Sequence, residues 1–182
     1  MITDKEREAA LALLARSRTV VLNAVDGVTD YQARWKPAPE RWSILEYVEH
    51  LAVSEDALIA MVKRSLEEPA HVETEEERKA REQKIRETPM PRGVNHAPQG
   101  LKPVARFNSL GEAVSAFLAA RERSVEYARS TTDDLRSHFT SHSVLGPLDG
   151  FQWLCANARH AESHAGHVVE IRGMAEFPTT DV

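Results

Sequence analysis

Helix-start signals recur along this sequence at positions that fit four long helices. Three stretches match Ser/Thr-x-x-Glu, the pattern in which a hydroxyl and a glutamate satisfy free N–H groups of a first helical turn; they begin at Thr3, Ser43 and Ser109. A looser version, Asp-x-x-Gln, begins at Asp149. Each signal opens a stretch with apolar residues at helical spacing, and no alternating strand pattern of useful length occurs. The sequence therefore predicts an all-α fold, a four-helix bundle.

The segments between these predicted helices differ in character. Residues 28–42 form a proline-stiffened loop with two tryptophans that could fold over the end of the bundle. Residues 68–102 form a long, charged and proline-rich insertion between the second and third predicted helices. The charged run that begins at Glu73 could form a solvated helix. A connection of this length is typical of a lid, a dimer arm or a disordered excursion, and a charged run is most often simply solvated.

Length, charge and cysteine content narrow the class of protein. The chain has 182 residues, which fits a single helical-bundle domain over 1–182. Its one cysteine, Cys155, excludes an intramolecular disulfide and is interpreted as a packed residue rather than a nucleophile. The net charge of −5 disfavours a nucleic-acid partner. The charged start is unlike a signal peptide and no apolar run approaches a membrane span, so we expect a soluble cytoplasmic protein with no membrane partner.

Three histidines share one stripe of the last predicted helix. At about 100° per residue, His160, His164 and His167 fall within a narrow sector together with Trp153 and Ile171. That stripe must face the interior, where an unpaired polar group costs about 1–3 kcal/mol. Two histidines at i and i+4 can supply two ligands to one metal ion. The pair His160 and His164 therefore predicts a metal site.

The best candidate for a third ligand is His50 on the second predicted helix. Neighbouring helices of a bundle lie about 8–10 Å apart, so imidazoles from both sides can share an ion. A three-histidine site with an open fourth position can activate water or bind an anion. Taken alone, His50 would more often be a hydrogen-bonded core or edge histidine. His167 lies about 10.5 Å along the helix from His160, so we expect a pocket residue rather than a ligand, and Glu170 could hydrogen-bond an imidazole.

Other polar residues are weaker candidates. Arg121 shares an apolar stripe of the third predicted helix, so it either pairs with a carboxylate or points into the pocket to hold a substrate anion. His138 and His142 are also spaced i, i+4, but they precede a Gly-Pro break and are a poor second metal site. His71 and His96 are poorer still. The sequence lacks G-x-S-x-G, a phosphate-binding glycine loop and CxxC, which leaves metal chemistry.

Three stretches of the chain carry a family resemblance: residues 42–51 (WSILEYVEHL), residues 107–121, and residues 148–154 (LDGFQWL) leading to His160 and His164. Together they resemble the DinB/YfiT-like metalloenzyme superfamily. The resemblance implies a four-helix bundle, often dimeric, with a three-histidine divalent metal site, Zn or Ni, whose ligands match His50, His160 and His164. Members often read H-x-x-x-H-R-G-Q, whereas this chain ends that run with Ala-Gly-His, which puts substrate contacts at these positions in doubt.

The resemblance also implies a range of activities. Characterised relatives include transferases and isomerases that use low-molecular-weight thiols. We therefore expect a metal-dependent enzyme of the thiol S-transferase or hydrolase type that acts on a small molecule, such as a low-molecular-weight thiol, which Arg121 or His167 helps to orient. The resemblance also implies a homodimer. One alternative is a non-catalytic metal-binding stress or interaction protein with a structural metal. Another is a metal-free bundle that dimerises and keeps its histidines hydrogen-bonded.

Overall fold

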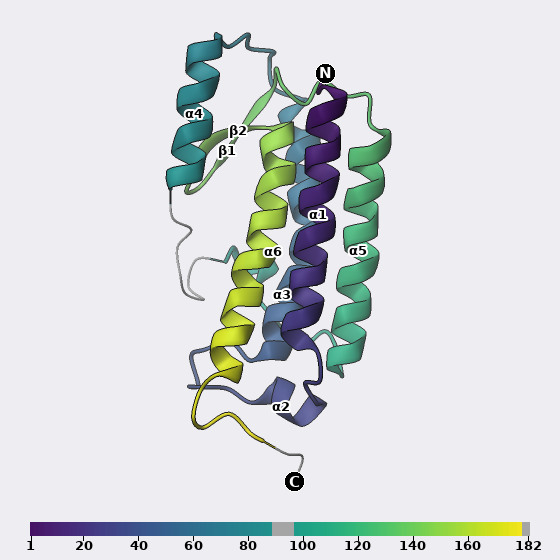
Figure 1. Cartoon of the computed structure of the whole chain (residues 1–182), viewed down its shortest axis with the longest axis vertical. Helices are drawn as coiled ribbons and strands as arrows, with labels where there is room; N and C mark the ends of the chain where they lie inside the picture. Colours follow the sequence, from purple (N-terminus) through teal and green to yellow (C-terminus); the bar gives the residue numbers. More distant parts are fainter. Residues whose placement is uncertain (89–96, 180–182) are drawn as a thin grey trace.

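Four long helices lie side by side along most of the length of the molecule (Figure 1). The computed structural model describes residues 1–88 and 97–179. The four helices are α1 (Asp4–Val25), α3 (Ile44–Ser65), α5 (Leu110–Ser130) and α6 (Gly150–Arg172). The all-α four-helix bundle predicted from the sequence is confirmed.

The order of the helices around the bundle is not their order in the sequence. α1 and α3 each pack against both α5 and α6, so α1 and α3 occupy opposite corners. α1 and α6 run in the same direction, and Arg172 near the end of α6 donates to the carbonyl of Ala24 near the end of α1. α3 and α5 also run in the same direction (Figure 1). A parallel pair cannot be joined by a tight turn, so the chain needs a long crossover between α3 and α5.

Helix starts follow the predicted capping signals closely. At Thr3 and Ser43 the side chain accepts from the third backbone N–H of the helix, and the glutamate there accepts from the cap N–H. The signal at Ser109 is half formed, because its hydroxyl accepts from the N–H of Glu112 while the Glu112 carboxylate accepts from Asn108 instead. The caps fix where α1, α3 and α5 begin.

The structure adds a short hairpin that the sequence analysis did not predict. β1 (Phe139–His142) pairs antiparallel with β2 (Gly146–Asp149), and β2 leads directly into α6. The expectation of no strands was wrong here because four-residue strands are too short to display an alternating pattern. Within the 28–42 loop a further short helix forms, α2 (Asp30–Arg34). One of that loop's tryptophans, Trp35, packs edge-on against Phe177 at 5.8 Å.

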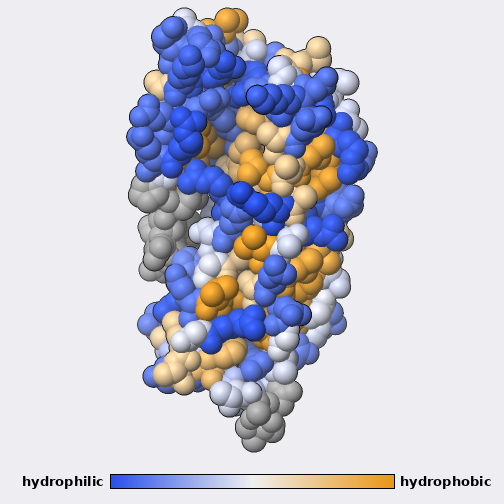
Figure 2. All heavy atoms as spheres, in the orientation of Figure 1, coloured by the Kyte–Doolittle hydropathy of each residue, from blue (hydrophilic) through white to orange (hydrophobic). Residues whose placement is uncertain are grey.

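The insertion contains a docked helix. α4 (Glu75–Glu87) has no buried residue, and its surface is almost uniformly hydrophilic (Figure 2). It is nevertheless fixed, because Arg81 binds Glu73 and also reaches Gln152 and Asp149 at the start of α6. A 3-10 turn, η2 (Gln99–Leu101), follows beside α3. Residues 89–96, which include His96, lie outside the described residues.

A polar layer divides the bundle core. Its centre is Arg121, which is 1% exposed, binds the carboxylate of Glu55 and donates to Leu14 and Ser17 on α1. Ser124 and Asn157 also donate to Glu55, at 2.9 and 3.1 Å. Two apolar clusters fill the bundle on either side of this layer, one including Phe117 and Leu51, the other Trp153 and Val62. Of the two alternatives for Arg121, pairing with a carboxylate is the one that the structure shows, because Glu55 on α3 also points inward; Arg121 does not line the cavity, and the expectation that it helps to orient a substrate is corrected.

Across the described residues, no helix is both long and apolar enough to cross a membrane.

Candidate metal centre

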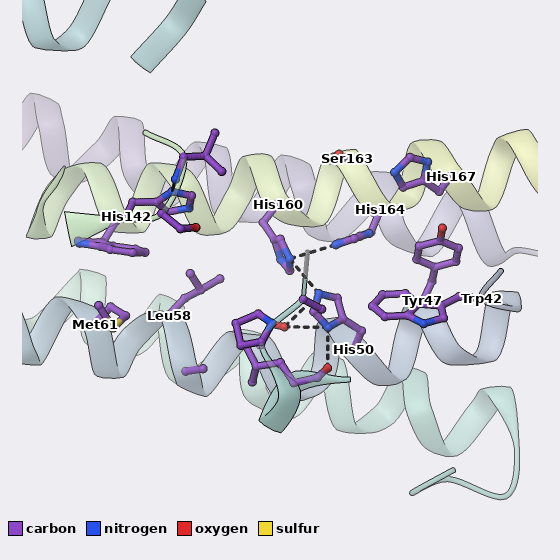
Figure 3. Close-up of a pocket in the computed structure, with 18 of the residues that line it drawn as sticks. Trp42, Tyr47, His50, Leu58, Met61, His142, His160, Ser163, His164 and His167 are labelled. Carbon is purple, nitrogen blue, oxygen red and sulfur yellow. Dashed lines mark hydrogen bonds between the residues drawn. The ribbon is translucent and has the colours of Figure 1, made fainter. Parts of the chain in front are cut away.

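Three imidazoles from two helices converge at one point of the bundle. Nε2 of His160 lies 3.1 Å from Nε2 of His50 and 3.0 Å from Nε2 of His164. Each of these residues offers a ligand nitrogen, and the three nitrogens lie within 4.8 Å of one another. Figure 3 shows the rings facing one another across the gap between α3 and α6. The structure thus brings together the three histidines that the sequence analysis selected.

The backbone of the insertion sets the orientation of His50. Nδ1 of His50 lies 2.8 Å from the carbonyl oxygen of Leu101 in η2. A carbonyl can only accept, so Nδ1 carries the proton and donates it. In the neutral ring Nε2 then has a free lone pair, and that lone pair is directed at the other two histidines. Metal-binding histidines characteristically hold their second nitrogen in this way.

All three rings are neutral at ordinary pH. Burial, reinforced by the nearby His50 and Arg121, lowers the pKa of His160 to about 3. Burial and the neighbouring His160 lower the pKa of His164 well below its usual range. Burial also lowers the pKa of His50, against the opposing effect of its hydrogen bond to Leu101. Neutral imidazoles are the form that binds a metal ion.

Hydrogen bonds among the three histidines cannot satisfy all of the ring nitrogens that face one another. In a neutral ring, Nε2 of His160 carries either one proton or one lone pair, yet it faces two other ring nitrogens. With a lone pair it opposes the lone pair of His50; with a proton it must divide that proton between two acceptors. Nδ1 of His164 is also buried with no partner among the described residues. A divalent cation that accepts three imidazole lone pairs removes the conflict at Nε2, so these residues fit such an ion.

The histidine cluster opens onto a cavity of about 710 Å³. α3 and α6 form two of its walls, and the tip of the β1–β2 hairpin and residues 97–101 of the insertion form the others. Trp42 closes one side, with its ring 5.0 Å from His50 and 6.3 Å from His164. None of the described lining residues carries a carboxylate, an ammonium or a guanidinium group. The cavity is therefore a neutral, largely apolar chamber beside a cluster of metal-binding side chains.

His167 lines the cavity but lies outside the cluster, as the sequence analysis expected. Its ring centre is 5.8 Å from that of His164, and it stacks on Tyr47 at 5.4 Å. Nδ1 of His167 lies 3.2 Å from the carboxylate of Glu170, so the imidazole has an acidic partner. His167 thus lines the cavity while its Nδ1 is held by Glu170.

The weaker sequence candidates do not form a second site among the described residues. His138 and His142 separate: Nδ1 of His138 donates to the carbonyl of Glu68, while His142 lines the cavity. His71 packs against Phe139 and takes no part in the cavity. Cys155 is a free, partly buried thiol, and burial raises its pKa to about 12.

Two contributors to the site were missed from the sequence. One is Leu101, which acts through its backbone carbonyl, so its side chain gives no signal. The other is Glu49, which is 1% exposed and accepts hydrogen bonds from the N–H groups of Val104 and Arg106 and from the Arg106 guanidinium. An acidic residue directly before His50 on a buried helix face was the signal that could have revealed it.

The fold and the cluster together define a class: helical bundles in which histidines from two antiparallel helices meet beside a pocket. The chain belongs to the DinB superfamily, whose family model matches residues 13–168.

Known proteins resemble the chain over nearly its whole length. A curated relative, the uncharacterized protein YuaE of Bacillus subtilis, is 24% identical over 167 residues, covering 91% of this chain and 99% of the relative. Among solved structures, YfiT from Bacillus subtilis, described as a probable metal-dependent hydrolase with an unusual four-helix bundle topology, superimposes with a TM-score of 0.61 at 17% identity, covering 94% and 88% of the two chains. A conserved protein from Enterococcus faecalis gives 0.61 at 15% identity, covering 91% and 94%. Both likenesses establish the fold.

Proposed function

We propose that this protein is a divalent-metal-dependent enzyme of the hydrolase or thiol S-transferase type, with His50, His160 and His164 as metal ligands. The observation that carries the proposal is the convergence of three neutral imidazoles on the wall of a cavity of about 710 Å³. Hydrogen bonds among the three rings cannot satisfy all of the nitrogens that face one another. The description of YfiT as a probable metal-dependent hydrolase supports it. The family resemblance favours zinc or nickel.

A bound divalent cation would supply Lewis acidity, which lowers the pKa of water or of a thiol at neutral pH. The chain's own residues would do the rest. Leu101 holds the ring of His50 in the tautomer that presents its lone pair. His167, fixed through Nδ1 by Glu170, is placed to take a proton from the nucleophile. Trp42 and Tyr47 line that end of the cavity with aromatic rings.

The neighbourhood of the cluster favours an enzyme over a structural metal protein. A purely structural zinc site is closed by four protein ligands. Among the described residues the cluster offers three, and its surroundings are a cavity rather than packed core. Substrates with an uncharged reacting portion fit the lining best.

Metal analysis of protein purified without a histidine tag tests the proposal. We expect about one equivalent of divalent metal in the wild type and in His138→Ala, since His138 lies outside the cluster, and a loss of most of it in His164→Ala. A wild type that stays empty in metal-replete medium, or a His164→Ala variant that keeps its full complement, contradicts the proposal.

Cobalt substitution separates the two reaction types. Co²⁺-loaded protein is titrated with 2-mercaptoethanol, and a new near-ultraviolet thiolate-to-metal band supports a thiol as nucleophile. A change in the visible bands with azide, without a thiolate band, supports water and hydrolysis. A spectrum that responds to neither indicates full ligation by protein groups and a structural metal. The low-molecular-weight thiol and the homodimer stay predictions.

A further inference from the structure

The cavity continues well beyond the histidine cluster. Trp153 precedes His160 by seven residues on α6, which places it about 10 Å along the helix axis. Met61 follows His50 by eleven residues on α3, about 16 Å along that axis. Both line the cavity, together with Leu58 and with His142 at the end of β1.

In Figure 3 His142, Leu58 and Met61 lie on the opposite side of the cluster from Trp42, Tyr47 and His167. We call this end, formed by His142, Trp153, Leu58 and Met61, the hairpin end.

The hairpin turn fixes the tautomer of His142. The backbone N–H groups of Val144 and Leu145 donate to its Nδ1 at 3.1 and 3.2 Å. Both partners are donors, so Nδ1 must be the acceptor and carries no proton. In the neutral ring the proton therefore resides on Nε2. His142 is therefore a hydrogen-bond donor of fixed orientation: among the described residues its hydrogen bonds are the two at Nδ1, and its Nε2–H makes none.

The described surroundings of His142 are uncharged and largely apolar, although Ser141 and Ser143 beside it also line the cavity. Its ring lies 5.2 Å from the ring of Trp153, tilted by 42°. Burial lowers the pKa of His142, so the ring stays neutral at ordinary pH. Among the described lining residues there is no carboxylate to accept the Nε2 proton and no lysine or arginine to hold an anion. The chemical complement of this end is an apolar group that terminates in an uncharged acceptor, such as a ketone, ester or amide carbonyl.

We propose that the hairpin end is a substrate-recognition subsite, in which Nε2–H of His142 donates to a neutral carbonyl oxygen of an otherwise apolar ligand packed against Trp153, Leu58 and Met61. The inference rests on the proposed function only in taking the cavity as the substrate site. It makes His142 a positioning and specificity residue, remote from the atoms that react at the histidine cluster. The substrate would then span the distance from the cluster to the hairpin.

A matched pair of probes tests this assignment. 2-Acetylnaphthalene presents a carbonyl, and 2-isopropenylnaphthalene has nearly the same shape with a methylene group in place of the oxygen. Binding of each is measured by NMR titration, with and without one equivalent of Zn²⁺. A net hydrogen bond should make the ketone bind about threefold to tenfold more tightly to the wild type.

The variants distinguish donation from turn stabilisation. In His142→Asn a side-chain oxygen can still accept from the turn N–H groups, but the ring Nε2–H is lost. We expect the ketone preference to fall to about one in this variant and to persist in the control His138→Asn, whose side chain lies outside the cavity.

Long-range ¹H–¹⁵N spectra give a readout that does not depend on a variant folding. They should show His142 with its proton on Nε2, and that nitrogen should shift on addition of the ketone but not of the hydrocarbon. The proposal is overturned if the proton of His142 is found on Nδ1, or if the wild type binds the ketone and the hydrocarbon with equal affinity. It is also overturned if His142→Asn retains the ketone preference, or if that preference is seen only with Zn²⁺. If the protein binds no metal, the proposed function fails while the ketone preference of the metal-free protein still decides the subsite.

Discussion

Nδ1–H of His50 donates a 2.8 Å hydrogen bond to the carbonyl oxygen of Leu101, which ties a candidate metal ligand on α3 to the end of the insertion. The preceding residue, Glu49, binds the next part of the same segment through Val104 and Arg106. Two consecutive residues of α3 therefore hold this segment in place. The insertion is part of the site, because its backbone orients a ligand.

Weakening this anchor should weaken metal binding. In Glu49→Gln the charge that pairs with Arg106 is lost and one of the two carboxylate acceptors becomes a donor. The segment that carries Leu101 should loosen, and we expect zinc affinity to fall about tenfold, as for other changes behind a metal ligand. Competition with a chromophoric chelator measures this. Asp56→Asn, which alters an exposed ion pair on the same helix, should leave the affinity unchanged; equal losses in both variants would argue against the anchor.

The polar layer around Arg121 and Glu55 should contribute to the free energy of unfolding. Arg121→Met leaves the buried carboxylate of Glu55 with only the neutral donors Ser124 and Asn157. We expect a loss of about 3–5 kcal/mol in the free energy of unfolding, since the remaining charge is uncompensated. The double variant Arg121→Met/Glu55→Met should recover most of that loss. Urea unfolding measures both, and a single variant that costs less than about 1 kcal/mol would contradict this account.

The metal-free protein should lose stability on acidification. The pKa of His160 is lowered to about 3 by burial, and those of His50, His164 and His142 are lowered as well. In the unfolded chain these imidazoles take up protons below about pH 6.5, whereas in the folded protein they take them up only at lower pH, so unfolding is favoured as the pH falls.

The slope of the unfolding free energy against pH reports how many imidazoles have a lowered pKa in the folded protein. His160, with its pKa lowered to about 3, should contribute roughly 1 kcal/mol per pH unit between about pH 6 and pH 4, and the other buried rings should add to the same trend. His160→Asn removes one of these groups and should flatten the dependence of the unfolding free energy on pH. A metal-free wild type that becomes more stable over this interval would refute the assignment of neutral rings.

Cys155 should be unreactive in the native protein. Burial, with a smaller contribution from the charge of Asp149, raises the pKa of its thiol to about 12. Since the thiolate is the reactive form, the rate with Ellman's reagent should be about a thousandfold below that of an ordinary thiol at neutral pH. In guanidinium chloride the same thiol should react rapidly and completely. A fast native reaction would mean that Cys155 is open to solvent and ionised.

Helical periodicity and capping chemistry were enough to predict the bundle, because both are local. The four predicted starts begin the four long helices, and helical angle alone placed His160 and His164 on an inward stripe. The pairing with His50 could be predicted because bundle helices lie close enough for any two inward imidazoles at the same level to meet.

Features that depend on partners distant in sequence were harder to predict. Helical angle showed that Arg121 points inward, but it could not show that Arg121 forms an ion pair with Glu55 across the core. The hydrogen bond from His50 to Leu101 involves a backbone carbonyl, which every residue possesses. The solvated helix suggested by the charged run from Glu73 does form, as α4, with a complete capping box at Thr74 and Glu77. Its attachment to Gln152 through Arg81 could not be predicted from the run of charges.

The parallel course of α3 and α5 has a consequence for how bundles of this topology diverge. Any chain that follows it must travel back along the bundle before α5 begins, and here the returning segment supplies part of the cavity wall at residues 97–101. Lengthening, shortening or replacing that segment would reshape the chamber without altering the helices that carry the histidines. Differences in substrate choice among such bundles should therefore accumulate in the crossover first.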